Sequence, residues 1–106
     1  MTARQRKTEA LKISRETYNK VYERDKGCII CKTKIHDKII EGNYAPLECH
    51  HFISRAKLGM GIEENLVMLC KYHHIEETAY RQQIEQYLKG QYPHWNKERL
   101  VYKKYD

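Results

Sequence analysis

The sequence lacks any long apolar run. A bilayer-spanning helix needs about 20 consecutive apolar residues, and no segment of the 106 residues approaches that length. The first residues, 1–12, are polar and basic and lack the apolar stretch of a signal peptide. Internal repeats and low-complexity segments are also absent. We therefore expect no membrane association and an intracellular location.

Small size and cysteine content point towards a bound metal. A chain of 106 residues buries only a marginal core, and domains of this size often need a metal or disulfides. Thiols stay reduced inside cells, so the four cysteines are better explained as metal ligands than as disulfides.

The charge balance is basic. There are 20 Lys+Arg against 14 Asp+Glu, a formal net charge of +6. Such an excess favours a polyanionic partner such as nucleic acid, although many small proteins are basic for no specific reason. Residues 1–13 hold four of the cations and little apolar content, which fits a flexible basic arm or the start of a helix.

The pattern of caps and apolar residues predicts an α+β fold. Ser14 is a good N-cap for a helix that Gly27 ends. Its expected apolar residues are Tyr18, Val21 and Tyr22. The elements expected after it are an irregular segment 32–46, a strand 46–53, a turn 59–61, a strand 65–70 and a helix from about 72 to 88. The apolar stripe expected on that helix comprises Ile75, Ala79, Ile84, Tyr87 and Leu88. Gly90 is expected to end the helix, and Asn96 to cap a short helix in the tail.

Two ligand pairs stand about 40 residues apart, as Cys28-x-x-Cys31 and Cys70-x-x-His73. Each pair can reach one ion from a single turn, and two pairs complete a tetrahedral zinc site. Because protein ligands fill all four coordination positions, the pattern indicates a structural zinc. This zinc is expected to join a tight turn at Cys28–Cys31 to the last helix. Unmetallated thiols and a redox Cys-x-x-Cys are the alternatives, and the second leaves Cys70 and His73 unexplained. Cys49 is predicted to be a small core residue.

A second group of histidines accompanies this site. His50 and His51 are adjacent on a predicted strand and therefore point to opposite faces. His74 follows His73 at a helix start, where adjacent side chains diverge by about 100 degrees. His73 can therefore face zinc while His74 faces the strand. Any one of these histidines alone is better explained as an ordinary surface or core residue, and it is the three together that indicate a site.

Taken together, these motifs resemble the HNH endonuclease family, whose active site is a ββα-metal fold. The likeness covers residues 28–74. Within them it is carried by Cys28-x-x-Cys31, by the segments 47–53 and 65–70, and by Cys70-x-x-His73-His74. It implies one HNH domain over residues 14–106, with a C-terminal helical extension, after the basic arm 1–13. A weaker likeness in size and in the basic, aromatic tail links the chain to small bacteriophage HNH proteins. Some of those act beside the DNA-packaging terminase.

The resemblance also implies roles for individual residues. His51 takes the position of the general base, and His50 and His74 take those of ligands to a catalytic divalent metal, Mg²⁺, Mn²⁺, Ni²⁺ or Co²⁺. Asn65 takes the middle position, where it braces the loop and orients the base. Two departures from the family are His73, which stands where Cys is usual, and Glu77, which stands near a frequent Lys. A carboxylate there repels phosphate unless it binds metal.

The function implied is metal-dependent hydrolysis of double-stranded DNA, in phage DNA processing or packaging, in the cytoplasm of a bacterial host. Arg55 and Lys57 are candidate phosphate contacts, although each is equally explained as a solvated charge. No base-reading motif is evident, so we expect weak sequence specificity. Two rivals stay open: a zinc-bearing DNA-binding or packaging adaptor without nuclease activity, and a scaffold whose zinc serves only folding.

Overall fold

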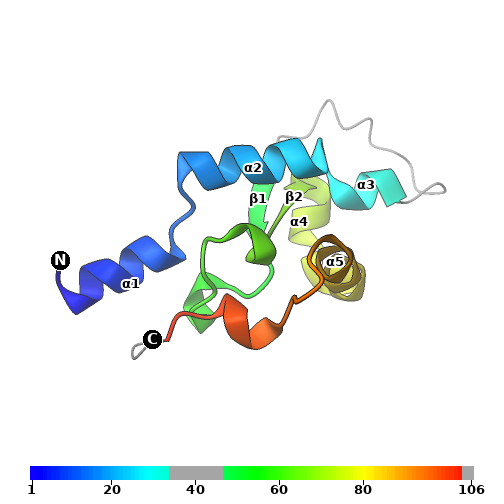
Figure 1. Cartoon of the computed structure of the whole chain (residues 1–106). Coiled ribbons are helices and arrows are strands. Elements are labelled where there is room, and N and C mark those ends of the chain that lie inside the picture. The colour runs from blue at the N-terminus through cyan, green and yellow to red at the C-terminus, as the bar shows by residue number, and fades with distance from the viewer. Residues whose placement is uncertain (34–46, 104–106) are drawn as a thin grey trace.

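The computed structural model describes residues 1–33 and 47–103, and within them the predicted α+β class is confirmed (Figure 1). The helices are α1 (Ala3–Leu11), α2 (Arg15–Asp25), α3 (Ile29–Thr33), α4 (Lys71–Ile75) and α5 (Glu77–Gln91). The strands are β1 (Leu47–His51) and β2 (Leu66–Cys70). Three short 3₁₀ helices are η1 (Arg55–Lys57), η2 (Glu63–Asn65) and η3 (Lys97–Leu100). Most of the irregular segment expected at 32–46 lies outside the described residues. None of the helices in the described ranges is both long and apolar enough to cross a membrane.

The caps predicted for α2 are present. The Ser14 side chain accepts a hydrogen bond from the Thr17 N–H, and the helix ends at Asp25. Lys26, with a φ of 54°, and Gly27, with a φ of 130°, turn the chain out of the helix. Of the three apolar residues expected in α2, only Val21 is buried, while Tyr18 and Tyr22 are exposed. The buried residues of α2 are Val21 and Asp25, so the helix contributes one buried apolar side chain to the packing against the sheet.

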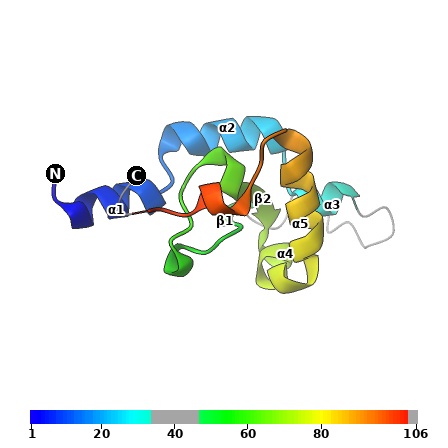
Figure 2. The same cartoon turned by 60° about the horizontal axis from the view of Figure 1, so that its bottom comes forward.

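The two strands form an antiparallel sheet in which Cys49 pairs with Met68, His50 with Val67 and His51 with Leu66. Every residue of β2 is buried, because helices cover both of its faces. Leu66 and Met68 pack with Val21 of α2. The alternate residues of β2 pack in the main core, whose members include Val67, Leu69, Phe52, Ile84, Leu88 and Leu100. Figure 2 shows α2 on one side of the sheet and α4 with α5 on the other.

The single helix predicted for 72–88 is divided in two. Glu76 adopts a φ of −101° and a ψ of 27°, which ends α4 and starts α5 in a new direction. As a consequence Ile75 and Ala79 are exposed, contrary to the predicted stripe, and Tyr80 is buried instead. The helix also continues past Gly90 to Gln91, so that glycine does not end it. In the tail, the Asn96 side chain accepts a hydrogen bond from the Glu98 N–H and caps η3 as predicted.

The N-terminal segment is joined to the loop that follows β1. The Gly61 N–H donates to the Ala10 carbonyl over 2.9 Å. A Cβ at Gly61 would lie 2.1 Å from the Lys12 carbonyl oxygen, so only glycine allows this approach. The tail lies along the same end of the molecule, because the Tyr102 N–H donates to the Leu58 carbonyl. Residues that are distant in sequence are thereby held beside the end of β1.

A buried ion pair at the end of α2 connects three elements. The Asp25 carboxylate accepts hydrogen bonds from the Met68 N–H (2.8 Å) and the Tyr87 hydroxyl (2.5 Å), and it pairs with Arg24 at 2.6 Å. The Arg24 guanidinium in turn donates to the Leu66 carbonyl over 2.6 Å. Each charge is therefore satisfied by hydrogen bonds that tie α2 to β2 and α5, as a buried pair requires.

Replacing Asp25 with Ala should lower the free energy of unfolding by about 3–5 kcal/mol, because the change leaves the Arg24 charge buried without its partner. Urea unfolding of the zinc-saturated protein measures this. Glu23→Ala, an exposed carboxylate in the same turn, is the control and should change stability by less than about 0.5 kcal/mol. Equal stability of the two variants would show that the ion pair contributes little.

Candidate active site

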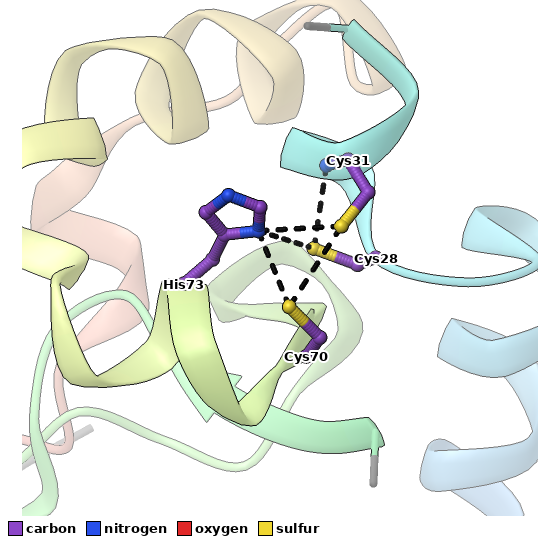
Figure 3. A group of neighbouring side chains, drawn as sticks. All are labelled: Cys28, Cys31, Cys70 and His73. Atoms are coloured by element: carbon purple, nitrogen blue, oxygen red, sulfur yellow. Dashed lines mark hydrogen bonds between the residues drawn. The ribbon is translucent and has the colours of Figure 1, made fainter. Parts of the chain in front are cut away.

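The four ligands predicted for zinc lie together, although they come from three elements (Figure 3). Cys28 precedes α3 and Cys31 lies within it. Cys70 is the last residue of β2, and His73 lies in α4. The Cys28–Cys31 segment, expected as a tight turn, is thus the start of a short helix. The cluster joins the helix that follows α2 to the helix that follows the sheet.

The dimensions of this cluster are close to those of a tetrahedral site. The Nδ1 atom of His73 lies 3.4, 3.3 and 3.2 Å from the Sγ atoms of Cys28, Cys31 and Cys70. The Sγ atoms of Cys31 and Cys70 are 3.7 Å apart. Zinc bonds of about 2.3 Å to sulfur and 2.0 Å to nitrogen place tetrahedral ligands roughly 3.5–3.8 Å apart. The residues present therefore fit a structural zinc ion.

Burial of the cluster agrees with a closed site. Cys28, Cys70 and His73 are buried, and Cys31 is partly buried. Burial, together with the neighbouring Cys28 and Cys70 thiols, raises the pKa of Cys31 to about 12. The raised pKa favours the protonated thiol. A bound cation reverses this preference, because it stabilises the thiolate form of its ligands. The set of three thiols and one imidazole is thus suited to hold a metal and not to serve as free thiols.

Cys49 lies outside this cluster. It is half-buried on β1 and packs against Val21, Leu66 and Met68. Burial, with a contribution from Asp25, raises its pKa to about 11, so the thiol stays protonated and unreactive. These contacts support the prediction that Cys49 is a small packing residue.

A second group of possible metal ligands consists of His50, His74 and Glu77. One ligand atom of each lies within 4.8 Å of the others. His50 comes from β1, His74 from α4 and Glu77 from the first residue of α5. The sequence predicted that His50 and His74 would meet, and their ring centroids are 4.9 Å apart.

The protonation states in this group suit metal binding. Burial, followed by the neighbouring His74, His51 and Arg81, lowers the pKa of His50 to about 3. The imidazole is therefore neutral near pH 7, which is the form that binds metals. His74 places Nδ1 at 2.9 Å from the Glu48 Oε1 atom. A carboxylate only accepts, so Nδ1 carries the proton and Nε2 of His74 is left as a ligand atom.

Glu77 has an unsatisfied oxygen inside this group. Its Oε2 atom is buried and has no hydrogen-bond partner among the described residues. Nε2 of His50 lies 2.7 Å away, within the range of an ion pair but without the geometry of a hydrogen bond. A divalent cation between the two groups would satisfy this oxygen, so the donor set fits a second metal.

His51 points away from the second metal group, as strand alternation predicts. Its Nε2 atom lies 2.9 Å from the carbonyl oxygen of Leu11, at the end of α1. Since a carbonyl only accepts, Nε2 carries the proton and Nδ1 keeps its lone pair. Burial lowers the pKa of His51, and Arg55 lowers it further, while the hydrogen bond with Leu11 opposes this shift.

Asn65 is fully buried and fixes the loop that follows β1. Its Oδ1 atom accepts the Ile53 N–H at 2.8 Å, and its Nδ2 atom donates to the carbonyls of Ile53 and Met60. A Cβ at Gly59 would lie 1.7 Å from the Ile53 carbonyl oxygen, so this loop also requires glycine. Asn65 does not touch His51 through any of these bonds.

Arg55 and Lys57 lie in η1 and are exposed, so both are free to meet a ligand. Three contacts of the site were not predicted: Glu77 near His50, Glu48 with His74, and the Leu11 carbonyl with His51. The spacing His74-x-x-Glu77 is one helical turn, and Glu48-x-His50 shares a strand face, so local patterns could have indicated the first two. No local pattern indicates the third.

Purified protein should contain about one zinc ion per chain at the Cys28, Cys31, Cys70 and His73 cluster. Cys28→Ser should lose this zinc and unfold at a much lower temperature, because metal binding and folding are coupled. Metal analysis and thermal unfolding test both parts. Cys49→Ala should keep the zinc and serves as the control. A well-folded protein that contains no zinc would contradict the assignment.

Comparison with known proteins agrees with these observations. Residues 28–79 match the family model described as HNH endonuclease. No match was found among curated proteins or among solved structures. The matched segment contains β1, β2 and α4 in the order of a ββα-metal fold, with both candidate metal groups and His51. Residues 28–79 of this chain therefore belong to the HNH endonuclease family.

Proposed function

We propose that the chain is a metal-dependent endonuclease that hydrolyses phosphodiester bonds in double-stranded DNA. The observation that carries the proposal is the arrangement of two adjacent residues on β1. His50 belongs to a group of possible metal ligands, while His51 has one ring nitrogen hydrogen-bonded to a backbone carbonyl and the other without a hydrogen bond to any of the described residues. The family match supports a nuclease, because it spans both residues.

His51 acts as the general base in this proposal. Its Nδ1 atom removes a proton from water while Nε2–H stays bonded to the Leu11 carbonyl. The water oxygen attacks phosphorus, and the bond from phosphorus to the 3′ oxygen breaks. The leaving 3′ oxygen takes a proton from solvent, so the products are a 5′ phosphate and a 3′ hydroxyl, and His51 later returns its proton to solvent. The lowered pKa of His51 supports this role, since the imidazole is neutral near pH 7 and can accept the proton.

His50 and His74 would hold the catalytic divalent metal, as neutral imidazoles. When bound there, such an ion supplies positive charge to the scissile phosphate and to the leaving 3′ oxygen. Nitrogen ligands accept Mg²⁺, Mn²⁺, Ni²⁺ or Co²⁺, with affinity that rises towards the later metals. Glu48 keeps the Nδ1 proton of His74 in place. Asn65 maintains the loop beside the catalytic strand through its bonds to Ile53 and Met60.

The DNA contacts are proposed to be mostly with the phosphate backbone. Arg55 and Lys57 are exposed just after the catalytic strand. The exposed helix α1 adds Arg4, Arg6 and Lys7, and the chain as a whole carries a net charge of +6. A role in phage DNA processing beside a terminase, in the cytoplasm of a bacterial host, stays a prediction from sequence likeness.

The adaptor without nuclease activity is the rival that an experiment must exclude. Such a protein keeps the zinc cluster and the basic surface but has no use for a base with a free nitrogen. His51→Ala should therefore abolish metal-dependent cleavage of supercoiled plasmid, with a loss of about 10²- to 10⁴-fold in rate. Zinc content, folding and DNA binding should be unchanged. His74→Ala should also abolish cleavage, but through loss of the metal, so excess Mn²⁺ should restore part of its activity.

His94→Ala, which removes an exposed histidine from the tail, is the matched control and should cut at the wild-type rate. Wild-type cleavage by His51→Ala in the best metal would show that His51 is not the base. Loss of zinc or of folding in that variant would assign His51 a structural role. A wild-type protein that binds DNA but cuts it in no metal would establish the adaptor.

Affinity for DNA should fall steeply with salt and vary little between unrelated duplexes, because phosphate contacts release counterions. Arg55→Ala and Lys57→Ala should each weaken binding to all duplexes and reduce the salt slope by about one. Lys20→Ala is the control, since Lys20 lies on α2 and pairs with Glu16. Fluorescence anisotropy over a range of salt concentrations measures these slopes. Tight binding that persists at high salt would contradict recognition through the backbone.

A further inference from the structure

We propose that Glu77 is a third protein ligand of the catalytic divalent cation, so that the site is a set of two histidines and one carboxylate. The inference rests on the proposed function for the existence of that metal. It adds a ligand at a position near which the family often has lysine. The inference predicts that Glu77 raises the affinity of the site for the metal and occupies a coordination position that water would otherwise fill.

The first argument is distance. Ligand atoms of His50, His74 and Glu77 lie within 4.8 Å of one another. Glu77 Oε2 and His50 Nε2 are 2.7 Å apart. Two atoms bound to one ion at about 2.1 Å and at right angles are roughly 3 Å apart. The carboxylate is therefore placed where a ligand adjacent to His50 in the coordination shell would be.

The second argument is the environment of the carboxylate. The Glu77 side chain as a whole is 43% exposed, yet its Oε2 atom is buried and lacks a hydrogen-bond partner among the described residues. A buried oxygen without a partner is costly. Although the side chain as a whole reaches solvent, this oxygen lies inward beside His50, where a bound cation would satisfy it.

The third argument is the break between α4 and α5. Glu76 interrupts the helix, and Glu77 is the first residue of α5. His74 and Glu77 are three residues apart and thus lie on neighbouring positions across this junction. His50 approaches from β1 on the other side. The three ligands come from three elements that pack together, which holds their spacing fixed.

A carboxylate ligand has chemical consequences. It lowers the net charge of the site by one and supplies a hard oxygen, which Mn²⁺ and Mg²⁺ prefer to a site made of nitrogen alone. It also removes the conflict noted in the sequence, because the Glu77 charge is neutralised by the ion and no longer repels phosphate. Three protein ligands still leave coordination positions for water and for the substrate.

The test is a titration of the zinc-loaded chain with Mn²⁺ in the absence of DNA. Electron paramagnetic resonance measures the Mn²⁺ that stays free in solution. Wild-type protein should bind one Mn²⁺ per chain in addition to zinc. Glu77→Gln should weaken this binding by at least about tenfold. Glu76→Gln removes the adjacent exposed carboxylate and should bind as wild type does. Zinc content and thermal unfolding verify that each variant is folded.

A second measurement separates a ligand from a structural residue. At saturating Mn²⁺, Glu77→Gln should show higher water-proton relaxivity than wild type, because water occupies the position that the carboxylate has left. If Glu77→Gln does not fold, Glu77→Asp gives the same comparison, since the shorter side chain withdraws the oxygen. Wild-type Mn²⁺ affinity or unchanged relaxivity in these variants would overturn the inference, as would a wild-type chain that binds no Mn²⁺ beyond zinc.

The outcomes also separate this inference from the nuclease proposal. A chain that binds Mn²⁺ through Glu77 but never cuts DNA refutes the nuclease and retains the ligand. A chain that cuts DNA while Glu77→Gln binds Mn²⁺ normally retains the nuclease and refutes the ligand.

Discussion

The antiparallel pairing of β1 with β2 determines where both candidate metal groups can form. In its register, His50 lies opposite Val67 and His51 opposite Leu66. These partners belong to different clusters of buried residues, since Val67 packs towards α5 and Leu66 towards α2. A slip of one residue would exchange the two faces and carry His50 away from His74. Burial of both faces of β2 makes such a slip costly, because it would move apolar side chains from one cluster into the other.

The zinc cluster and the second metal group share the start of α4. His73 faces the thiols, and the adjacent His74 lies beside His50. Two consecutive residues of one helix turn thus serve two sites, because their side chains diverge by about 100 degrees. A metal ion bound by His73 would hold the backbone of that turn and thereby fix the position of His74. A structural metal in this arrangement would do more than stabilise a small core, since it would also place a ligand of the proposed catalytic metal.

Local patterns in the sequence predicted the parts of the fold that local interactions decide. The Ser14 and Asn96 caps depend on spacings within a few residues, and both are found as expected. The spacing within each pair of predicted zinc ligands is also local, and the two pairs lie together in a group that could hold a metal ion. The break at Glu76 was not predicted, because no Gly or Pro marks it and because it follows from how α4 and α5 pack separately. That break explains the exposure of Ile75 and Ala79, which a continuous helix would have buried.

Only those features of the site that follow from strand and helix periodicity were predicted from the sequence. Alternation placed His50 and His51 on opposite faces, and the helix start brought His74 towards His50. The carboxylate of Glu77 was recognised only as a departure from the family. A departure from a family pattern is informative when the new residue has a partner of suitable chemistry. Here two imidazole nitrogens and a buried carboxylate oxygen lie close together, which is a combination of donors that attracts a cation.

The N-terminal segment lies outside residues 28–79, yet it contacts the residue proposed as the base. The Leu11 carbonyl holds Nε2 of His51, and the Gly61 N–H holds the Ala10 carbonyl one residue earlier. Gly61 belongs to the loop that Asn65 braces through Met60. The end of α1 is therefore attached to the same loop that follows β1. Since the tautomer of His51 depends on one carbonyl oxygen, the geometry of this proposed base depends on the attachment as well as on the strand.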